Sequence, residues 1–132
     1  MQKYNSKNKN IYILVNDDIL KREDAKVSVF DSVVQGGDAV WEGLRLYDGG
    51  IFLLNEHLER LVKSAKMLDF EEIPDKLEIK RSISRVLKAN NMKDRVHIRL
   101  TLTRGLKYTS GMDPKVNLGP PTLIILPEWK DP

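Results

Sequence analysis

The chain has 132 residues, of which 41% are hydrophobic and 31% are charged. This balance fits one globular domain and excludes collagen-like, mucin-like and fully disordered proteins. The chain contains no cysteine, which excludes disulfide scaffolds, thiolate zinc sites and cysteine nucleophiles. No apolar run approaches the ~20 residues of a membrane-spanning helix, and no apolar stretch follows Met1 that could act as a signal peptide. We therefore expect a cytoplasmic protein that does not associate with membranes.

The net charge of +3 has a local origin. Lys3, Lys7 and Lys9 lie in the first ten residues, which contain no acidic residue, and the rest of the chain is balanced in charge. A balanced body has no overall attraction to a phosphate backbone, and no nucleic-acid-binding motif is present. We expect residues 1–10 to be a disordered basic tail and nucleic acid not to be a partner.

The first part of the chain predicts several strands and tight turns. Apolar or alternating runs that are typical of strands occur at residues 11–15, 19–20, 26–30, 40–47 and 51–54. Turn residues at 16–18 separate the first two runs, and Asp48-Gly49-Gly50 predicts a hairpin between the last two. Gly36 and Gly37 indicate a tight backbone or a close approach by another group.

Two amphipathic helices follow these strands. Asn55 is a suitable N-cap for the first helix, and Pro74 separates the two. Asp75 and Glu78 form a capping box at the start of the second helix, which ends near residues 90–91. The apolar stripe of the first helix is Leu58, Leu61, Val62, Ala65 and Leu68, and that of the second is Ile79, Ile83, Val86 and Leu87.

Two further strands complete the pattern. Residues 95–104 alternate clearly, residues 105–121 form a long loop, and residues 122–126 are apolar on both faces, which is typical of a central strand. The order of strands, two helices and strands predicts an α+β fold, with a largely antiparallel sheet and two helices packed on one face. We assign residues 11–128 to one domain and residues 129–132 to the start of an interdomain linker.

The helices can cover only one face of this sheet. The uncovered face would present Trp41, Gly43, Arg45, His97, Arg99 and Thr101. A polar strand face is usually just solvated. Tryptophan and glycine are unusual in that role, however, and the planar guanidinium of arginine suits carboxylate or phosphate. We therefore interpret this face as one half of a small-molecule site. No metal-ligand spacing stands out.

Four segments in order, residues 27–31, 37–45, 54–61 and 98–105, resemble the class IV (fold-type IV) pyridoxal-phosphate aminotransferases. This family includes branched-chain and D-amino-acid aminotransferases and aminodeoxychorismate lyase. The resemblance implies the smaller N-terminal domain of a two-domain enzyme, with pyridoxal 5′-phosphate bound between the domains. It also implies amino-group transfer between a branched-chain-like amino acid and a 2-oxo acid, a C-terminal catalytic domain as partner, and a homodimer.

The resemblance also implies roles for individual residues. Arg60, in the run His-Leu-Glu-Arg-Leu, would bind the cofactor phosphate. Trp41 would contact the substrate side chain, Arg99 the substrate carboxylate, and Arg45 would line the pocket. Gly36 stands where many members have a tyrosine, which removes a hydroxyl and opens the pocket. We expect Arg60 to lie near Arg99 on one wall of the cofactor cleft.

The Schiff-base lysine of the family would lie beyond Pro132. We therefore expect no catalytic residue within this chain and no activity from the chain alone. Lys107 lies in the long loop and does not match the lysine motif. Two alternatives stay open: a lyase that acts on aminodeoxychorismate, and a non-catalytic module that uses its exposed sheet face for interaction.

Overall fold

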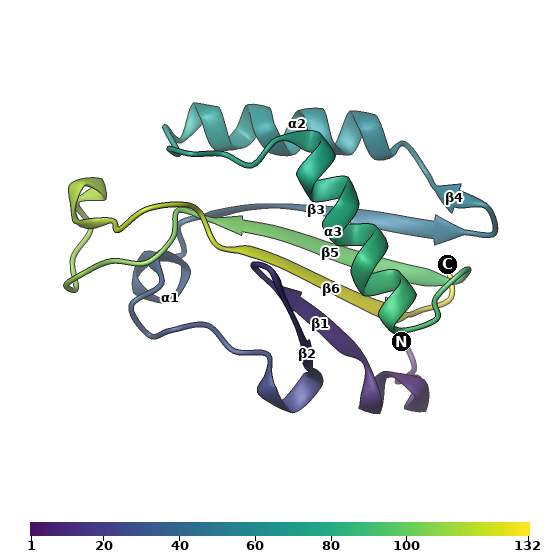
Figure 1. Cartoon of the computed structure of the whole chain (residues 1–132). Coiled ribbons are helices and arrows are strands. Elements are labelled where there is room, and N and C mark those ends of the chain that lie inside the picture. The colour runs from purple at the N-terminus through teal and green to yellow at the C-terminus, as the bar shows by residue number, and fades with distance from the viewer.

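The computed structural model describes residues 1–132, and a single antiparallel sheet forms its centre (Figure 1). Its strands are β1 (Tyr12–Val15), β2 (Asp18–Lys21), β3 (Ala39–Tyr47), β4 (Gly50–Ile51), β5 (Val96–Thr103) and β6 (Leu123–Trp129). They lie in the order β2-β1-β6-β5-β3-β4. The helices are α1 (Ser32–Gly36), α2 (Leu54–Met67) and α3 (Lys76–Ala89), with short 3₁₀ turns η1 (Ser6–Asn10), η2 (Arg22–Asp24) and η3 (Pro114–Val116).

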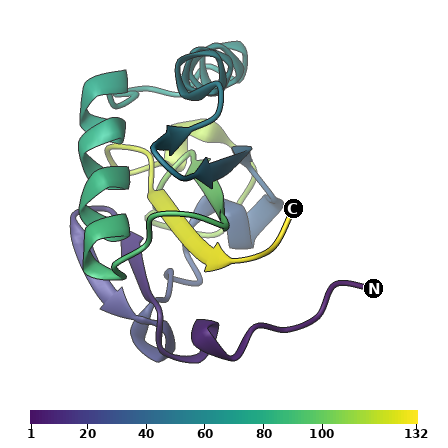
Figure 2. The same cartoon turned by 90° about the vertical axis from the view of Figure 1, so that its right-hand side faces the viewer.

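The two long helices pack on the same side of the sheet. Helix α2 contacts β3, and helix α3 contacts β1 and β6. Viewed along the sheet, α3 stands beside the strands and α2 lies at the end where β3 and β4 run (Figure 2). The opposite face is free of both helices, so the predicted α+β architecture is confirmed.

The alternation of the strands fixes which face is buried. Val96, Ile98, Leu100 and Leu102 are fully buried, whereas Arg99 between them is exposed. Strand β6 lies between β1 and β5, which confirms the prediction of a central strand from its apolar residues. These side chains form one core with Leu58, Leu61 and Ala65 of α2 and with the predicted stripe of α3, because all of them belong to a single buried cluster. Val62 and Leu68 of the predicted α2 stripe lie outside this cluster, and Leu68 is exposed because α2 ends at Met67.

The ends of the helices partly match the predictions. The Asp75 side chain accepts a hydrogen bond from the Glu78 amide at 2.9 Å, which confirms Asp75 as the cap of α3. Asn55 as the cap of α2 is wrong, because the helix begins at Leu54 and the preceding Leu53 has a φ of 52°. Strand β4 pairs with β3 over only two residues, so the chain turns into the helix earlier than the apolar run suggests.

Residues 26–30 do not form the predicted strand. The segment leads instead into α1, where the Asp31 side chain accepts a hydrogen bond from the Val33 amide at 2.9 Å. Gly37 ends this helix in the left-handed region with a φ of 67°, so the expected tight backbone at the glycine pair is present. The β-branched residues of this segment predicted a strand, but a turn forms instead, in which the Ser28 hydroxyl accepts from the Phe30 amide and the Ser28 carbonyl accepts from the Asp31 amide, both at 3.0 Å.

The predicted disordered tail is wrong for residues 6–10, which form η1. Asn8 is only 2% exposed. Its side chain donates to the Trp129 carbonyl at 3.0 Å and accepts from the Trp129 amide at 2.8 Å. The side-chain amide of Asn8 thus pairs with the backbone at the end of β6. Trp129 belongs to this strand and not to the expected linker.

The helices of the structure are all too short or too polar to cross a bilayer.

Candidate functional site

The face of the sheet opposite α2 and α3 brings the predicted polar residues together. In the antiparallel pairing of β3 with β5, Trp41 lies opposite Thr101 and Gly43 lies opposite Arg99. Arg45 lies opposite His97 in the same register. Directly opposed residues point to the same face, so we call the side that carries these pairs the open face. The prediction that these side chains share a face away from the helices is confirmed.

Arg99 and Trp41 form the most distinctive contact of the open face. The guanidinium carbon of Arg99 lies 3.5 Å from the ring centroid of Trp41, and Trp41 is 54% exposed. The Arg99 side chain makes no hydrogen bond or ion pair within the chain, whereas its neighbour Arg45 makes two hydrogen bonds. Stacking orients the guanidinium while its N–H donors stay free. The pair is therefore suited to hold a carboxylate or phosphate.

Strand β6 adds an apolar strip to the open face. Ile124 lies opposite Thr101 and Leu126 lies opposite Arg99, and both are half-buried. An anion-binding guanidinium thus has an indole and aliphatic side chains as neighbours. The sequence analysis missed these two residues, because their face depends on the pairing register and not on the strand pattern itself.

Arg45 lies on the open face but is engaged with the end of the chain. Its guanidinium donates to the carbonyl of Lys130 and, at 3.2 Å, to that of Asp131. The backbone amide of Lys130 donates to the Arg95 carbonyl at 2.9 Å. Arg45 therefore holds the residues that follow β6, in addition to any contact with a ligand.

His97 lies between these charged groups. Burial, followed by the positive charges of Lys130 and Arg45, lowers the pKa of His97 below its ordinary value. A side chain at Gly43 would bring its Cβ to 3.2 Å from Nε2 of His97. Glycine at this position thus leaves room for the imidazole on the open face.

Arg60 belongs to a different side of β3. Its Nε–H donates to both carboxylate oxygens of Glu42, at 2.9 and 3.0 Å, and its Nη2 donates to Oε1 at 2.7 Å. Glu42 follows Trp41 in β3 and faces the helices, so Arg60 and the Trp41–Arg99 pair approach β3 from opposite sides. Strand alternation separates Glu42 from Trp41, so Arg60 reaches β3 from the side of α2 and is not part of the open face. The expectation that Arg60 lies near Arg99 on one wall of a cofactor cleft stays a prediction.

Glu42 is the buried centre of this second cluster. It is 5% exposed and accepts a further hydrogen bond from Nδ1 of His57 at 2.7 Å. Burial acts to raise the pKa of Glu42, but hydrogen bonds and charges from Arg60 and His57 outweigh it and lower the pKa below its ordinary value. The Glu42 hydrogen bond correspondingly raises the pKa of Arg60. The Glu42 carboxylate is thus ionised, and both of its oxygens accept hydrogen bonds.

The residues around Arg60 fit the phosphate of pyridoxal 5′-phosphate. A shallow hollow of about 260 Å³ lies at the start of α2 and is lined by Leu53, Glu56, His57 and Arg60. The Arg60 side chain is 67% exposed, and Glu42 engages only Nε and Nη2. Arginine has five N–H donors, so Nη1 stays available for the oxygens of a phosphate.

A larger hollow lies elsewhere and includes none of the predicted site residues. Its volume is about 560 Å³, and it lies between α3 and the turn that joins β1 to β2. Arg81 and Arg85 share its lining with Asp17, Glu72 and Glu78. This mixed charge gives no preference for an anion.

Gly36 ends α1 and lies against the long loop. A Cβ at Gly36 would come within 2.8 Å of the Met112 methyl group. The space that a missing side chain would open is therefore partly filled by Met112. Glycine here permits a close approach of the loop, which sequence reasoning at the glycine pair had allowed for.

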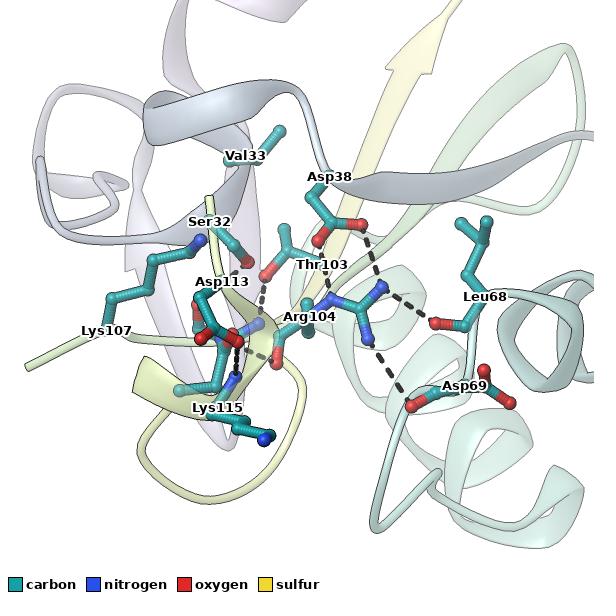
Figure 3. Close-up of polar contacts among 12 residues, drawn as sticks. Ser32, Val33, Asp38, Leu68, Asp69, Thr103, Arg104, Lys107, Asp113 and Lys115 are labelled. Carbon is teal, nitrogen blue, oxygen red and sulfur yellow. Dashed lines mark hydrogen bonds and ion pairs between the residues drawn. The ribbon is translucent and has the colours of Figure 1, made fainter. Parts of the chain in front are cut away.

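Arg104 joins three parts of the fold and was not singled out by the sequence analysis. Figure 3 shows its guanidinium between the Asp38 carboxylate and the carbonyls of Leu68 and Asp69. The Nη2 donates to Leu68 at 2.7 Å, and the guanidinium carbon lies 4.7 Å from the Phe70 ring centroid. Arg104 thus ties the ends of β3 and β5 to the end of α2.

Lys107 is buried within the same loop region (Figure 3). Its Nζ donates to the Gly111 carbonyl at 2.6 Å, so it organises the loop. The chain contains no group of three or more His, Cys, Asp or Glu residues arranged to hold a metal ion.

Comparisons with known proteins agree with the fold and also match the chain to a protein family. Residues 39–131 match the family model described as Amino-transferase class IV. Branched-chain-amino-acid aminotransferase-like protein 1 of Arabidopsis thaliana is 62% identical over 118 residues, which are 89% of this chain and 21% of that protein. A putative branched-chain-amino-acid aminotransferase of Methanocaldococcus jannaschii is 41% identical over 114 residues, which are 86% of this chain and 38% of that protein.

A solved structure shows the same architecture. The branched-chain amino acid aminotransferase from Escherichia coli superposes with a TM-score of 0.77 at 31% identity. The match covers 91% of this chain and 41% of that one. The chain therefore spans between about a fifth and two fifths of the length of the proteins that it matches.

Proposed function

Because this chain belongs to the class IV aminotransferases, we propose that it is the N-terminal domain of an enzyme that depends on pyridoxal 5′-phosphate. The enzyme transfers an amino group between a branched-chain-like amino acid and a 2-oxo acid. The stacked, unpaired guanidinium of Arg99 on Trp41 is the observation that carries this proposal. It offers an oriented cation beside an indole and the aliphatic side chains of Ile124 and Leu126.

The open face binds the substrate. Arg99 holds the carboxylate, because a planar guanidinium forms paired, charge-assisted hydrogen bonds with it. Trp41 orients Arg99 and contacts the substrate side chain, and Ile124 and Leu126 favour an aliphatic one. Arg45 lines the same pocket and also fixes the chain after β6. The space at Gly36 is shared with Met112.

Arg60 holds the phosphate of the cofactor from the side of α2. When bound, pyridoxal 5′-phosphate supplies an electron sink for the reacting carbon. The other residues of this chain bind and orient the reactants and exclude water. They carry no proton-transfer step, because a lysine outside this chain performs that work in our proposal.

A C-terminal catalytic domain that follows this one carries out the steps that this chain does not perform. That domain supplies the Schiff-base lysine and the second wall of the cleft. We further propose that the enzyme is a homodimer. The exposed apolar residues around α1 and the long loop, Val29, Phe30, Val34, Leu106, Tyr108, Met112 and Leu118, suit a contact between subunits.

The placement of the lysine is tested with the chain of residues 1–132. The purified chain is mixed with pyridoxal 5′-phosphate, an amino acid donor and a 2-oxo acid, and a parallel sample is reduced with borohydride. We expect no turnover, and no single lysine that is labelled in preference to the others. Robust turnover, or one dominant lysine adduct, would overturn the assignment of the lysine to another domain.

The reaction class is tested with the protein from the complete reading frame. Amino-group transfer from branched-chain donors supports the proposal, whereas cleavage of aminodeoxychorismate would establish the lyase alternative. A reading frame that stops after Pro132, together with no activity of either kind, would establish the non-catalytic interaction module.

A further inference from the structure

Glu42 stands out because it is a carboxylate in an apolar row. The residues of β3 that face the helices are Val40, Glu42, Leu44 and Leu46. Removing a carboxylate from water is costly, and an apolar side chain of similar size often stabilises a fold better. The fold alone therefore gives little reason for an acid at this position.

The hydrogen bonds of Glu42 indicate what the acid does instead. Both of its oxygens accept from Arg60, and Oε1 also accepts from His57. Arg60 and His57 lie one helical turn apart on α2, so one carboxylate fixes two neighbouring side chains. Both of these side chains line the hollow at the start of α2.

The arrangement limits the conformations of an exposed arginine. A free arginine side chain has many rotamers, and ordering them opposes ligand binding. Glu42 pairs with Nε and Nη2, which leaves the Nη1 side of the Arg60 guanidinium without a partner in the chain. The entropy of ordering Arg60 is thus lost on folding, before a phosphate arrives.

We propose that Glu42 is a positioning residue, which together with His57 holds Arg60 in the orientation that binds the phosphate of a phosphate monoester. This inference rests on the proposed function, in which that monoester is the cofactor. His57 donates to Oε1 of Glu42, an oxygen that also accepts from Arg60, and so helps to hold the carboxylate in place.

A purely electrostatic effect of Glu42 and a positioning role of Glu42 predict opposite changes in phosphate binding when this residue is substituted. Glu42 is negative and lies next to the hollow, so its charge by itself repels phosphate. If only charge mattered, Glu42→Gln would strengthen phosphate binding. If Glu42 positions Arg60, the same substitution weakens binding, although it removes a negative charge.

Glu56 provides a matched control on the same hollow. It lines the hollow beside Arg60 but makes no hydrogen bond or ion pair with it. Glu56→Gln removes the same charge and leaves Arg60 in place, so we expect unchanged or tighter phosphate binding. His57→Asn, which keeps a donor near the position of Nδ1, should retain more affinity than His57→Ala.

The experiment titrates the chain with pyridoxamine 5′-phosphate, which lacks the aldehyde that would react with lysines. Pyridoxamine without phosphate is the control ligand. The readouts are the dissociation constant and the NMR signal of the Arg60 Nε–H group, and thermal unfolding checks that each variant is folded. We expect Glu42→Gln to weaken binding of the phosphate form by about tenfold, with the control ligand unaffected.

The outcomes separate this inference from the proposed function. Tighter binding by Glu42→Gln, or binding equal to that of the unsubstituted chain, overturns the positioning role. Arg60→Ala then still reports on the proposed function, because loss of phosphate-dependent binding in that variant retains Arg60 as the phosphate ligand. If neither the chain nor the protein from the complete reading frame distinguishes the two ligands, both the phosphate site and the role of Glu42 are overturned.

Discussion

Asn8 and Trp129 join the two ends of the chain through a pair of hydrogen bonds between one side-chain amide and one backbone unit. The two atoms of the Asn8 amide lie 3.0 and 2.8 Å from the Trp129 carbonyl and amide nitrogen. Lys7 adds a contact, with its Nζ 5.5 Å from the ring centroid of Trp129. The N-terminal turn thus continues the hydrogen bonding of the sheet at the place where the chain leaves β6.

Asn8→Ala should destabilise the fold. The substitution leaves the amide and carbonyl of Trp129 without partners in a half-buried place. We expect the free energy of unfolding to fall by about 2 kcal/mol, as for the loss of two hydrogen bonds from buried groups. Urea unfolding measures this change. Asn10→Ala, in the same turn but exposed, is the control, and equal effects of the two substitutions would contradict the role of Asn8.

Gly105→Ala should be one of the most destabilising single changes in the chain. Gly105 has a φ of 104°, and an added Cβ would clash with the Pro120 carbonyl oxygen. Gly49 has a similar φ of 92° with open space around it. We expect a loss of about 3 kcal/mol or more for Gly105→Ala and about 1 kcal/mol for Gly49→Ala, because only the first adds a clash to the backbone strain. Thermal or urea unfolding of the two variants gives the comparison, and similar losses would refute it.

Arg104→Leu should loosen the end of α2 from the sheet. The substitution leaves the Asp38 carboxylate without its ion pair and the Leu68 carbonyl without its donor. We expect stability to fall by about 2 kcal/mol, with faster hydrogen exchange at residues 65–70. Arg81→Leu replaces an exposed arginine that has no ion pair and should have little effect. Unchanged exchange in Arg104→Leu would show that other contacts hold the end of α2.

The stability of the chain should depend on pH through His97. Because the pKa of His97 is lowered in the folded state, the unfolded chain binds a proton more readily. The neutral imidazole therefore contributes stability that is fully present above the unfolded pKa of about 6.5. This contribution is lost as the pH falls through the lower folded pKa.

His97→Gln, which cannot titrate, should reduce the slope of stability against pH in this range. Unfolding midpoints of both proteins between about pH 7 and about pH 5 provide the measurement. Parallel curves for the two proteins would show that His97 does not cause the dependence.

In the two-domain enzyme that we propose, Arg99→Lys should weaken substrate binding much more than it slows the reaction. A lysine cannot stack on Trp41 with a planar fork or pair with both oxygens of a carboxylate. We expect KM for the amino acid to rise by about tenfold, with a smaller change in kcat. A change confined to kcat would instead place Arg99 away from the substrate carboxylate.

Local patterns in the sequence predicted much of the fold. The alternation of Val96, Ile98, Leu100 and Leu102 predicted one buried strand face, and the stripe from Ile79 to Leu87 predicted the buried side of α3. The family resemblance placed the chain among the class IV aminotransferases, which the matched residues 39–131 support. These signals depend on residues close together in the chain, so no knowledge of the tertiary fold is needed to read them.

Local sequence patterns predicted only part of the candidate site. The alternation placed Trp41 and Arg45 on one face, and the same alternation put Glu42 in the opposite, apolar row. An acid in that row was a signal for a buried partner, and the cations of the following helix offered one. Neither the stacking of Arg99 on Trp41 nor the bonds from Arg45 to the end of the chain could be read from spacing.

The sequence by itself determined the buried sides of β3, β5 and α3, because side-chain direction repeats every two residues in a strand and every 3.6 in a helix. The tertiary structure decided the pairing register, the order β2-β1-β6-β5-β3-β4, and the division of the arginines between the two sides of β3. These features arise from contacts between segments that are far apart in the chain, such as Asn8 with Trp129 and Glu42 with Arg60. Their energies depend on positions that only the folded chain brings together.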